Sequence, residues 1–310
     1  MRIAIIDLGT NTFNLLIAEI FPDGHKRIFN TKVSVKLGEG AINKGFIAAV
    51  PFQRGIIALI EYKKIILEHR VEKIISIATS AIRSASNGKE FIQEAKKNAG
   101  IDIEMISGDR EAELIYYGTR KALNIGNSNA LIMDIGGGST EFIIANNEKI
   151  VWKKSFLLGA ARLLEKFSPS EPISKKEILE LENYLRAELF DLEMALKKFP
   201  VAELIGSSGV FDTFAEMCVL QFHPKILLHE HTEYIFDLNE FEKIHQQIIR
   251  STKEERHCTP GLIEMRVDMV VISSIFVNLI LKNFFLKKMR LSAYALKEGV
   301  LWEILHTKTL

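Results

Sequence analysis

The sequence has few cysteines, no excess of charge of one sign and no apolar run long enough to span a bilayer. Its two cysteines, Cys218 and Cys258, have no CxxC spacing, which argues against a disulfide framework and predicts free thiols in a reducing cytoplasm. The formal net charge is +1, so a DNA- or RNA-binding role is not expected, and an anionic substrate must be held by a local site. The most apolar stretch, residues 267–281, is shorter than the ~20 residues of a spanning helix and predicts a helix buried on all sides.

Several catalytic motifs are also missing. There is no Walker A, GxSxG or HExxH pattern, which argues against P-loop nucleotide hydrolysis, serine hydrolase chemistry and zinc peptidase chemistry. His229 and His231 would share a face if their segment were a strand, but no third ligand has a suitable spacing for zinc. The first residues, MRIAIIDLG, enter a strand pattern with no basic region and cleavage site before it. A cytoplasmic location without membrane attachment is therefore expected.

The strongest signal of organisation is an internal repeat. Residues 3–18 read IAIIDLGTNTFNLLIA and residues 130–145 read ALIMDIGGGSTEFIIA. Each is an apolar run, an Asp-x-Gly, a small polar turn and a second apolar run, which predicts a β-hairpin. Asp7 and Asp134 hold equivalent places. Two related domains are favoured over a solenoid, because the sequence between the copies differs.

The remaining pattern alternates strands and helices, which predicts α/β layers. Gly100 closes one predicted helix in the left-handed conformation, and Ser174 with Glu177 forms a capping box at the start of another. The polar, glycine-containing stretch 124–129 marks a boundary, so the domains are predicted at 1–125 and 126–310. The sequence leaves open whether a C-terminal helix at about 297–310 packs back on the first domain. Further strands are predicted at 28–37, 73–78, 101–106, 149–156, 202–207 and 288–293, and helices at 52–69, 88–99, 109–123, 174–198, 210–219 and 294–306.

Three small-residue turns are candidate phosphate-binding loops. A hairpin tip without bulky side chains lets backbone N–H groups approach a phosphate, and a glycine loop before a helix adds the helix dipole. Three successive glycines are more than one turn needs, and close approach to an anion explains the excess. Each turn alone is equally compatible with ordinary turn formation, so the hypothesis depends on their combination. The candidate donors are Gly9, Thr10 and Asn11; Gly136, Gly137, Gly138 and Ser139; and Gly206, Ser207 and Gly209.

Two further segments follow predicted strands. Thr79 and Ser80 offer hydroxyl donors and Arg83 offers a guanidinium suited to phosphate, although a capped helix with a solvent-facing arginine is equally compatible. Ser107 is a predicted N-cap, which places Glu111 in the first helical turn. Glu111 either complements the helix dipole or acts as a general base that activates water.

A family resemblance adds to this interpretation. The sequence is similar in order and spacing to the exopolyphosphatase/guanosine pentaphosphate phosphatase family of the sugar kinase–heat-shock protein–actin superfamily. The resemblance implies two ribonuclease H-like (actin-like ATPase) domains with an interdomain cleft. It also implies a Mg²⁺- (or Mn²⁺-) dependent hydrolase that removes the terminal phosphate of polyphosphate and/or guanosine pentaphosphate. The segments that carry it are DLGTNTFNLLI, KLGEG (36–40), ATSAIRSASN (78–87), ISGDREAELIYYG (106–118), DIGGGSTEF (134–142), GSSGVFDTFA (206–215) and SAYALKEGVL (292–301).

The resemblance also assigns roles. It places the catalytic glutamate on Glu111 and the acidic pair around the phosphate loop on Asp134 and Glu141. Asp7, at the end of its predicted strand, is suited to hold a metal or its waters, so the predicted metal ligands are Asp7, Asp134 and Glu141. Lys36 and Lys297 stand where arginine is frequent, and Asn14 where a larger polar or basic residue is often found. Two alternatives stay open: an ATP-dependent kinase or ATPase on the same scaffold, and a non-catalytic binder of polyphosphate or an alarmone. A homodimer, partly formed by helix 267–281, is a further possibility.

Overall fold

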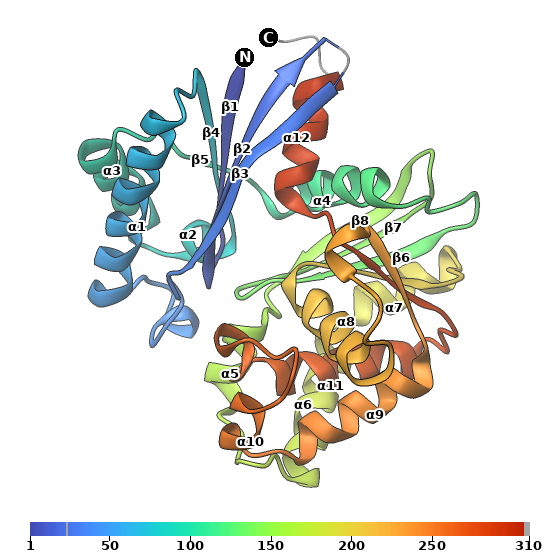
Figure 1. The fold of residues 1–310 in the computed structure, drawn as a ribbon. Coiled ribbons are helices and arrows are strands. Elements are labelled where there is room, and N and C mark those ends of the chain that lie inside the picture. Colours follow the sequence, from blue (N-terminus) through green and yellow to red (C-terminus); the bar gives the residue numbers. More distant parts are fainter. Residues whose placement is uncertain (23, 307–310) are drawn as a thin grey trace.

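The computed structural model describes residues 1–22 and 24–306, and their strands form two sheets (Figure 1). The first has the order β3-β2-β1-β4-β5 and the second the order β10-β11-β9-β6-β7-β8. The strands of the first are β1 (Arg2–Leu8), β2 (Thr12–Phe21), β3 (Gly24–Ser34), β4 (Lys73–Ala78) and β5 (Glu104–Met105). Those of the second are β6 (Ala130–Ile135), β7 (Thr140–Ala145), β8 (Ile150–Phe156), β9 (Leu204–Ser207), β10 (Glu233–Phe236) and β11 (Met289–Ser292).

The two sheets repeat one topology. In each, three antiparallel strands continue into two parallel ones: β3-β2-β1 into β4 and β5, and β8-β7-β6 into β9 and β11. The second sheet adds β10, antiparallel to β11. Both predicted hairpins are confirmed, and Asp7 and Asp134 each lie one residue before the end of the first strand of their sheet.

Helices cover the outer face of each sheet. On the first sheet these are α1 (Ala49–Glu68), α2 (Ser80–Ser84) and α3 (Gly88–Ala99), with the 3-10 helix η1 (Ile42–Lys44) beside them. Around the second sheet are α5 (Ala160–Phe167), α6 (Lys175–Glu188), α7 (Phe190–Lys198), α8 (Gly209–Phe222), α9 (Leu238–Arg250), α10 (Lys253–His257) and α11 (Val270–Asn283), with η2 (Leu228–Glu230) and η3 (Glu264–Arg266).

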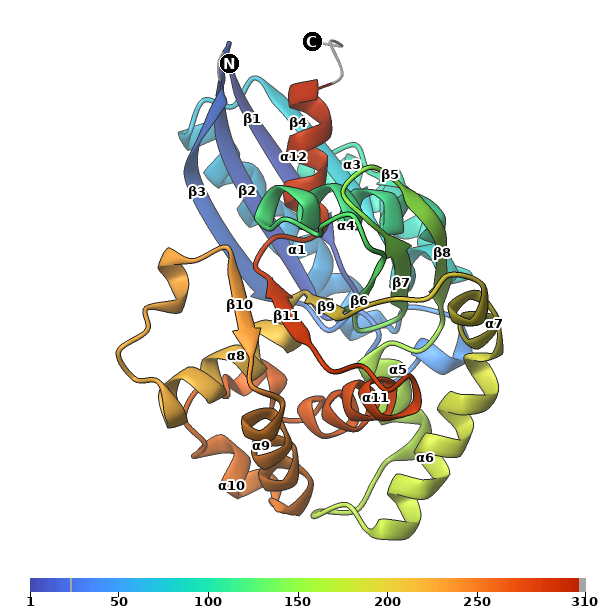
Figure 2. The ribbon, with the colours of Figure 1, turned by 90° about the vertical axis from the view of Figure 1, so that its right-hand side faces the viewer.

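Two helices lie between the sheets, as Figures 1 and 2 both show. They are α4 (Gly108–Ala122) and α12 (Leu296–His306), which pack on each other. Their apolar side chains share one core with strands of both sheets, including Ile3 and Ile5 of β1 and Ile132 of β6. The inner faces of the two sheets are thus joined through α4 and α12.

Local signals account for several element boundaries. Gly100 ends α3 with φ of 62°, and Ser174 and Glu177 form the predicted capping box of α6. The predicted helix 174–198 is two helices, interrupted at Leu189. Its apolar period continues through the break, with Leu185 and Leu192 both buried, and neither glycine nor proline marks the position.

Other predictions need correction. The strand predicted at 101–106 is reduced to Glu104–Met105, because only these residues pair with β4 at the edge of the sheet. The strand predicted at 28–37 begins earlier, at Gly24, and pairs with β2 along its length. His229 lies in η2 and His231 follows it, so they do not share a strand face.

The apolar helix α11 is buried within the chain, as predicted, from Val270 to Leu281. It therefore presents none of these residues to a second copy. In the part of the chain that the structure describes, no helix combines the length and apolarity needed to cross a membrane. Cys218 is buried, Cys258 is exposed, and both are free.

Candidate functional site

A cavity of about 550 Å³ lies between the sheets, where their equivalent turns face each other. It receives the ends of β1, β4 and β6, the starts of α4 and α8, and the segment before α12. The predicted residues that line it are Asp7, Gly9, Thr10, Asn11, Thr79, Ser80, Glu111, Asp134, Gly136, Gly137, Gly138, Ser139 and Gly209. Arg83, Glu141, Gly206 and Ser207 stand outside this lining.

Two aspartates reach the cavity from equivalent strands. Asp7 pairs across its hairpin with Asn14, and Asp134 pairs with Glu141. Asn14 Nδ2 donates a hydrogen bond of 3.0 Å to Asp7 Oδ2. Burial raises the pKa of Asp7 to about 6, against the lowering effect of Lys297, and burial likewise raises the pKa of Asp134 to about 6. A nearby cation favours the charged form of a buried carboxyl group and offsets the effect of burial. Asp7 and Asp134 therefore both suit a bound cation.

The fit to a metal ion differs among the three predicted ligands. Asp7 and Asp134 face the cavity, but Glu141 accepts a hydrogen bond of 2.7 Å from Ser155 Oγ. Within residues 1–22 and 24–306, no three His, Cys, Asp or Glu side chains are grouped to hold a metal. Two carboxylates nevertheless suit Mg²⁺, which usually keeps several waters and takes its other ligands from substrate phosphates.

Two of the three successive glycines, Gly137 and Gly138, face the opposing turn. A Cβ atom added to Gly138 would lie 2.5 Å from Thr10 Oγ1 and 2.7 Å from Ser80 Oγ, and one added to Gly137 would lie 2.6 Å from Asn11 Nδ2. Gly136 closes its own turn by donating to the Ser139 carbonyl, at 3.0 Å. The excess of glycine therefore has a second cause besides approach to an anion, namely contact between the two halves of the molecule.

Glu111 is buried in the cavity wall and bound by an arginine. Ser107 caps α4 by accepting from the Arg110 N–H, which places Glu111 in the first turn. Arg83 Nη1 contacts Glu111 Oε2 at 2.9 Å and also donates to the Ile106 carbonyl at 3.0 Å. Burial and the nearby Glu141 raise the pKa of Glu111 well above its ordinary value, against the lowering effect of Arg83. Arg83 thus bonds Glu111 and is not part of the cavity lining itself.

Glu141 forms a second layer behind Glu111. Burial and Asp134 raise the pKa of Glu141. The absence of a side chain at Gly108 lets α4 pack on Ser155, whose hydroxyl donates to Glu141. The two glutamates are therefore neighbours, with Glu111 toward the cavity and Glu141 behind it.

The third loop contributes only its last two residues. A Cβ at Gly206 would overlap the Phe211 ring, and Ser207 Oγ donates to the Tyr294 carbonyl at 3.4 Å. Ser208, which belongs to the predicted loop but was not among its candidate donors, has φ of 73° and lines the cavity with Gly209.

Four charged residues of the cavity were missed or undervalued. Asp212 follows the third loop in the first turn of α8, a position that the sequence does reveal. Lys297 was noted only as a replacement for arginine. Lys32 on β3 and Arg266 in η3 carry no motif and are far apart in sequence from the loops. All four line the cavity.

These charges face one another. Burial raises the pKa of Asp212 to about 6, while Arg266, Lys297 and Lys32 lower it. The Nε atom of Arg266 is buried and has no hydrogen-bond partner among the described residues. Buried donors without partners are rare in folded proteins, and an anionic ligand would satisfy this one.

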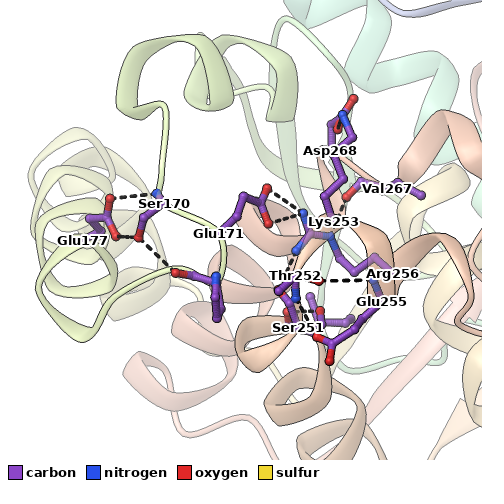
Figure 3. A network of polar contacts seen from close by, with 12 residues as sticks. Ser170, Glu171, Glu177, Ser251, Thr252, Lys253, Glu255, Arg256, Val267 and Asp268 are labelled. Atoms are coloured by element: carbon purple, nitrogen blue, oxygen red, sulfur yellow. Dashed lines mark hydrogen bonds and ion pairs between the residues drawn. The ribbon is translucent and has the colours of Figure 1, made fainter.

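The two residues that follow Arg266 in the chain, Val267 and Asp268, are held by a network of polar contacts (Figure 3). Arg256, itself fully buried, donates to the Val267 carbonyl at 2.9 Å and to the Ser251 carbonyl at 2.8 Å, and contacts both Glu171 carboxylate oxygens at 2.7 Å. Lys253 pairs with Asp268 at 2.6 Å. Arg266 therefore directly precedes two residues that are held in place by polar contacts, and Arg266 itself lines the cavity.

Two sheets of one topology that enclose a cleft, with a turn from each at its floor, define a two-domain protein of the actin-like fold. The boundary at residue 125 stays a prediction. The chain belongs to the Ppx/GppA phosphatase family, whose model matches residues 16–308.

Three relatives place it within that family. A crystal structure of an exopolyphosphatase from Cytophaga hutchinsonii is 41% identical, with a TM-score of 0.96 over 98% of each chain. The Aquifex aeolicus member of the Ppx/GppA family is 26% identical, with a TM-score of 0.81 over 100% of this chain and 99% of that one. Exopolyphosphatase 1 of Mycobacterium tuberculosis is 24% identical over 97% of this chain and 87% of its own length.

Proposed function

We propose that this chain is an exopolyphosphatase that releases orthophosphate from the end of inorganic polyphosphate. Family membership and the relatives named exopolyphosphatase support the substrate class. The observation that carries the proposal is Glu111, a buried carboxylate in the wall of a cavity whose other walls are small-residue turns. Such turns suit phosphoryl oxygens, and the carboxylate suits activation of water.

In the proposed reaction, the terminal phosphate lies between the two loops. Main-chain N–H groups of Gly137 and Gly138 and the hydroxyls of Thr10 and Ser80 bind its oxygens. A water attacks phosphorus in line with the bridging oxygen, the P–O bond to the chain breaks, and Glu111 accepts the proton of the water. The products are orthophosphate and a polyphosphate shorter by one unit.

Arg83 and Glu141 act through Glu111 in this scheme. Arg83 fixes the orientation of the Glu111 carboxylate, and Glu141 raises the pKa of Glu111, which strengthens it as a base. Asp7 and Asp134 would hold Mg²⁺, which when bound neutralises charge on the phosphoryl oxygens. Lys32, Arg266 and Lys297 bind phosphates further along the chain.

Guanosine pentaphosphate is a second candidate substrate, favoured by an adjoining cavity of about 410 Å³. This cavity shares Asn11, Thr12 and Arg266 with the first. Its lining includes the apolar side chains of Leu164, Pro169, Met265 and Met269, which suit a nucleobase better than a phosphate chain. The bond broken would be the same terminal phosphoanhydride.

The test is phosphate release by the purified full chain with Mg²⁺, offered polyphosphate, guanosine pentaphosphate and ATP in parallel. We expect release from polyphosphate, and a loss of roughly 10²- to 10⁴-fold in kcat in Glu111→Gln, the range of general-base contributions. Glu113→Gln is the matched control, since Glu113 lies on the same helix but pairs with Arg110 and Lys153 away from the cavity. Turnover of ATP alone would identify a kinase or ATPase instead, and tight binding without release would identify a binder.

A further inference from the structure

Arg162 on α5 joins the two halves of the molecule with a single guanidinium. Its Nε donates to the Gly138 carbonyl at 3.0 Å, within its own half. Its Nη1 donates to the Ile42 carbonyl at 3.0 Å and its Nη2 to Ser84 Oγ at 3.4 Å, both in the other half. One planar side chain therefore bonds the glycine loop and crosses the cleft.

Asn43, in the other half of the molecule, also forms hydrogen bonds to α5. Asn43 Nδ2 donates to the Arg162 carbonyl at 3.0 Å, and the Asn43 N–H donates to Glu165 Oε1 at 3.2 Å. Ser84 also donates its hydroxyl proton to the Ser80 carbonyl at 2.8 Å. A continuous path of hydrogen bonds thus runs from Gly138 through Arg162 and Ser84 to Ser80.

The two ends of this path meet inside the cavity. Gly138 and Ser80 lie in contact across it, close enough that a Cβ on Gly138 would overlap Ser80. These are the loops that bind the terminal phosphate in the proposed function, on which this inference rests for its effect on hydrolysis. The distance between the loops is therefore fixed on one side by direct contact and on the other by Arg162.

The partners of Arg162 are all neutral oxygen atoms. None of the ion pairs found for residues 1–22 and 24–306 includes Arg162. A carboxylate partner would be left charged and unpaired if the halves separated, whereas carbonyl and hydroxyl oxygens that lose the guanidinium can bond to water instead. This bonding can therefore be made and broken reversibly.

We propose that Arg162 is a positioning residue that latches the two halves closed and sets the spacing of the Gly136–Ser139 and Thr79–Ser80 loops. The cross-cleft bonds exist only when the halves are closed. Loss of the latch lowers the closed population, and a ligand that requires the closed state then binds more weakly by the same factor. Saturating substrate restores closure.

The kinetic test compares Arg162→Met with Lys166→Met, a matched loss of positive charge on the same helix. Lys166 instead lies over the Tyr184 ring, at 4.3 Å. We expect Arg162→Met to raise KM for polyphosphate roughly 10- to 100-fold, the effect of losing hydrogen bonds to a charged group, with kcat within about threefold of the parent. Arg162→Lys, which keeps one donor group, recovers part of the loss, and Lys166→Met changes neither constant.

A distance measurement tests closure without catalysis. Two spin labels are introduced, at Lys89→Cys on α3 and at Lys176→Cys on α6, which are exposed positions in opposite halves. Cys258→Ser removes the exposed native cysteine, which would otherwise also be labelled. We expect Arg162→Met to add a population with longer label separation, which shrinks when tripolyphosphate is added. If Arg162→Met does not fold, Asn43→Ala and Ser84→Ala, which each remove one cross-cleft bond, take its place.

The outcomes separate this proposal from the function on which it rests. Unchanged label separation in Arg162→Met overturns the latch, whether or not the parent releases phosphate. A lengthened separation in Arg162→Met, combined with no phosphate release by the parent, supports the latch and overturns the exopolyphosphatase proposal. A fall in kcat with KM unchanged also overturns the latch, because it points to damage at the reacting groups.

Discussion

Asp7 and Asp134 occupy the same position in two copies of one sheet, and both enter the cavity with a pKa raised to about 6. Asp134 is buried and Asp7 is partly buried, and the charge of Asp134 adds to the raised pKa of Asp7. Because the two sheets repeat one topology, they bring together two carboxyl groups, and the charged forms of these groups repel each other unless a cation is bound.

Stability should depend on pH and Mg²⁺ together. Because the folded pKa of both aspartates is raised from 3.8 to about 6, their contribution to stability is present below the unfolded pKa and is lost as pH rises through about 6. Mg²⁺ should therefore raise the melting temperature more at about pH 8 than at about pH 5, since a carboxylate must be deprotonated to bind it. Thermal melts with and without Mg²⁺ measure this.

The matched variant is Asp7→Asn combined with Asp134→Asn, which should abolish the difference between the two pH values. An equal Mg²⁺ effect at both, or an effect that survives in the variant, would place the metal elsewhere.

Arg266 should control affinity and leave stability intact. Its Nε is buried without a partner among the described residues, and none of the ion pairs found among those residues includes Arg266, so neutralisation leaves no directly bonded carboxylate unpaired. We expect Arg266→Gln to raise KM for polyphosphate about tenfold, the loss of one charge-assisted hydrogen bond, with the melting temperature unchanged or higher. Lys287→Gln, an exposed lysine beyond α11, should change neither quantity. A lower melting temperature with normal KM would mean that Arg266 is structural.

His245 should make the fold sensitive to acid. It is buried between Ser274 and Asn278, and burial lowers its pKa to about 4. The unfolded chain binds a proton from pH 6.5 downward and the folded chain only below about 4, so the free energy of unfolding falls as pH drops through this window. Urea denaturation across it should show this loss, and His245→Gln should reduce the slope. The same slope in the variant would assign the effect to other groups.

Arg256 should be among the most costly residues to remove. Met in its place leaves the Ser251 and Val267 carbonyls without their donor, and each buried acceptor left unsatisfied costs roughly 1–3 kcal/mol, whereas the partly exposed Glu171 carboxylate can bond to water. Lys253→Met is the control, because the Lys253–Asp268 pair is partly exposed and such pairs contribute less than about 1 kcal/mol. Equal losses in urea denaturation would show that the buried network adds nothing beyond a surface pair.

The fold was largely readable because its signals are local. The Asp-x-Gly hairpins, Gly100 and the Ser174–Glu177 box each depend on neighbours in sequence, and the two-domain actin-like architecture follows from their repetition. The break at Leu189 was missed because the apolar period runs through it. The short β5 was overestimated because an edge strand is limited by its partner, which an isolated apolar run does not reveal.

The residues of the candidate site likewise fall into those that local sequence predicts and those that only tertiary packing brings into place. The turns at Thr10 and Gly138 were predicted from their own composition. Lys32 and Arg266 were not, because each is an isolated basic residue whose place depends on tertiary packing. Arg83 was predicted to face phosphate, but its contact with Glu111 joins α2 to α4 and could not be derived from either segment alone.

The position of α12 bears on how the chain is assembled. This helix covers the inner face of the first sheet, yet it follows every strand of the second sheet in the chain. During synthesis on the ribosome, α4 can reach this apolar face early, but the contribution of α12 to the core around Ile3 and Ile5 comes only after the second sheet has emerged. The two halves therefore share a core that is completed by the last helix of the chain.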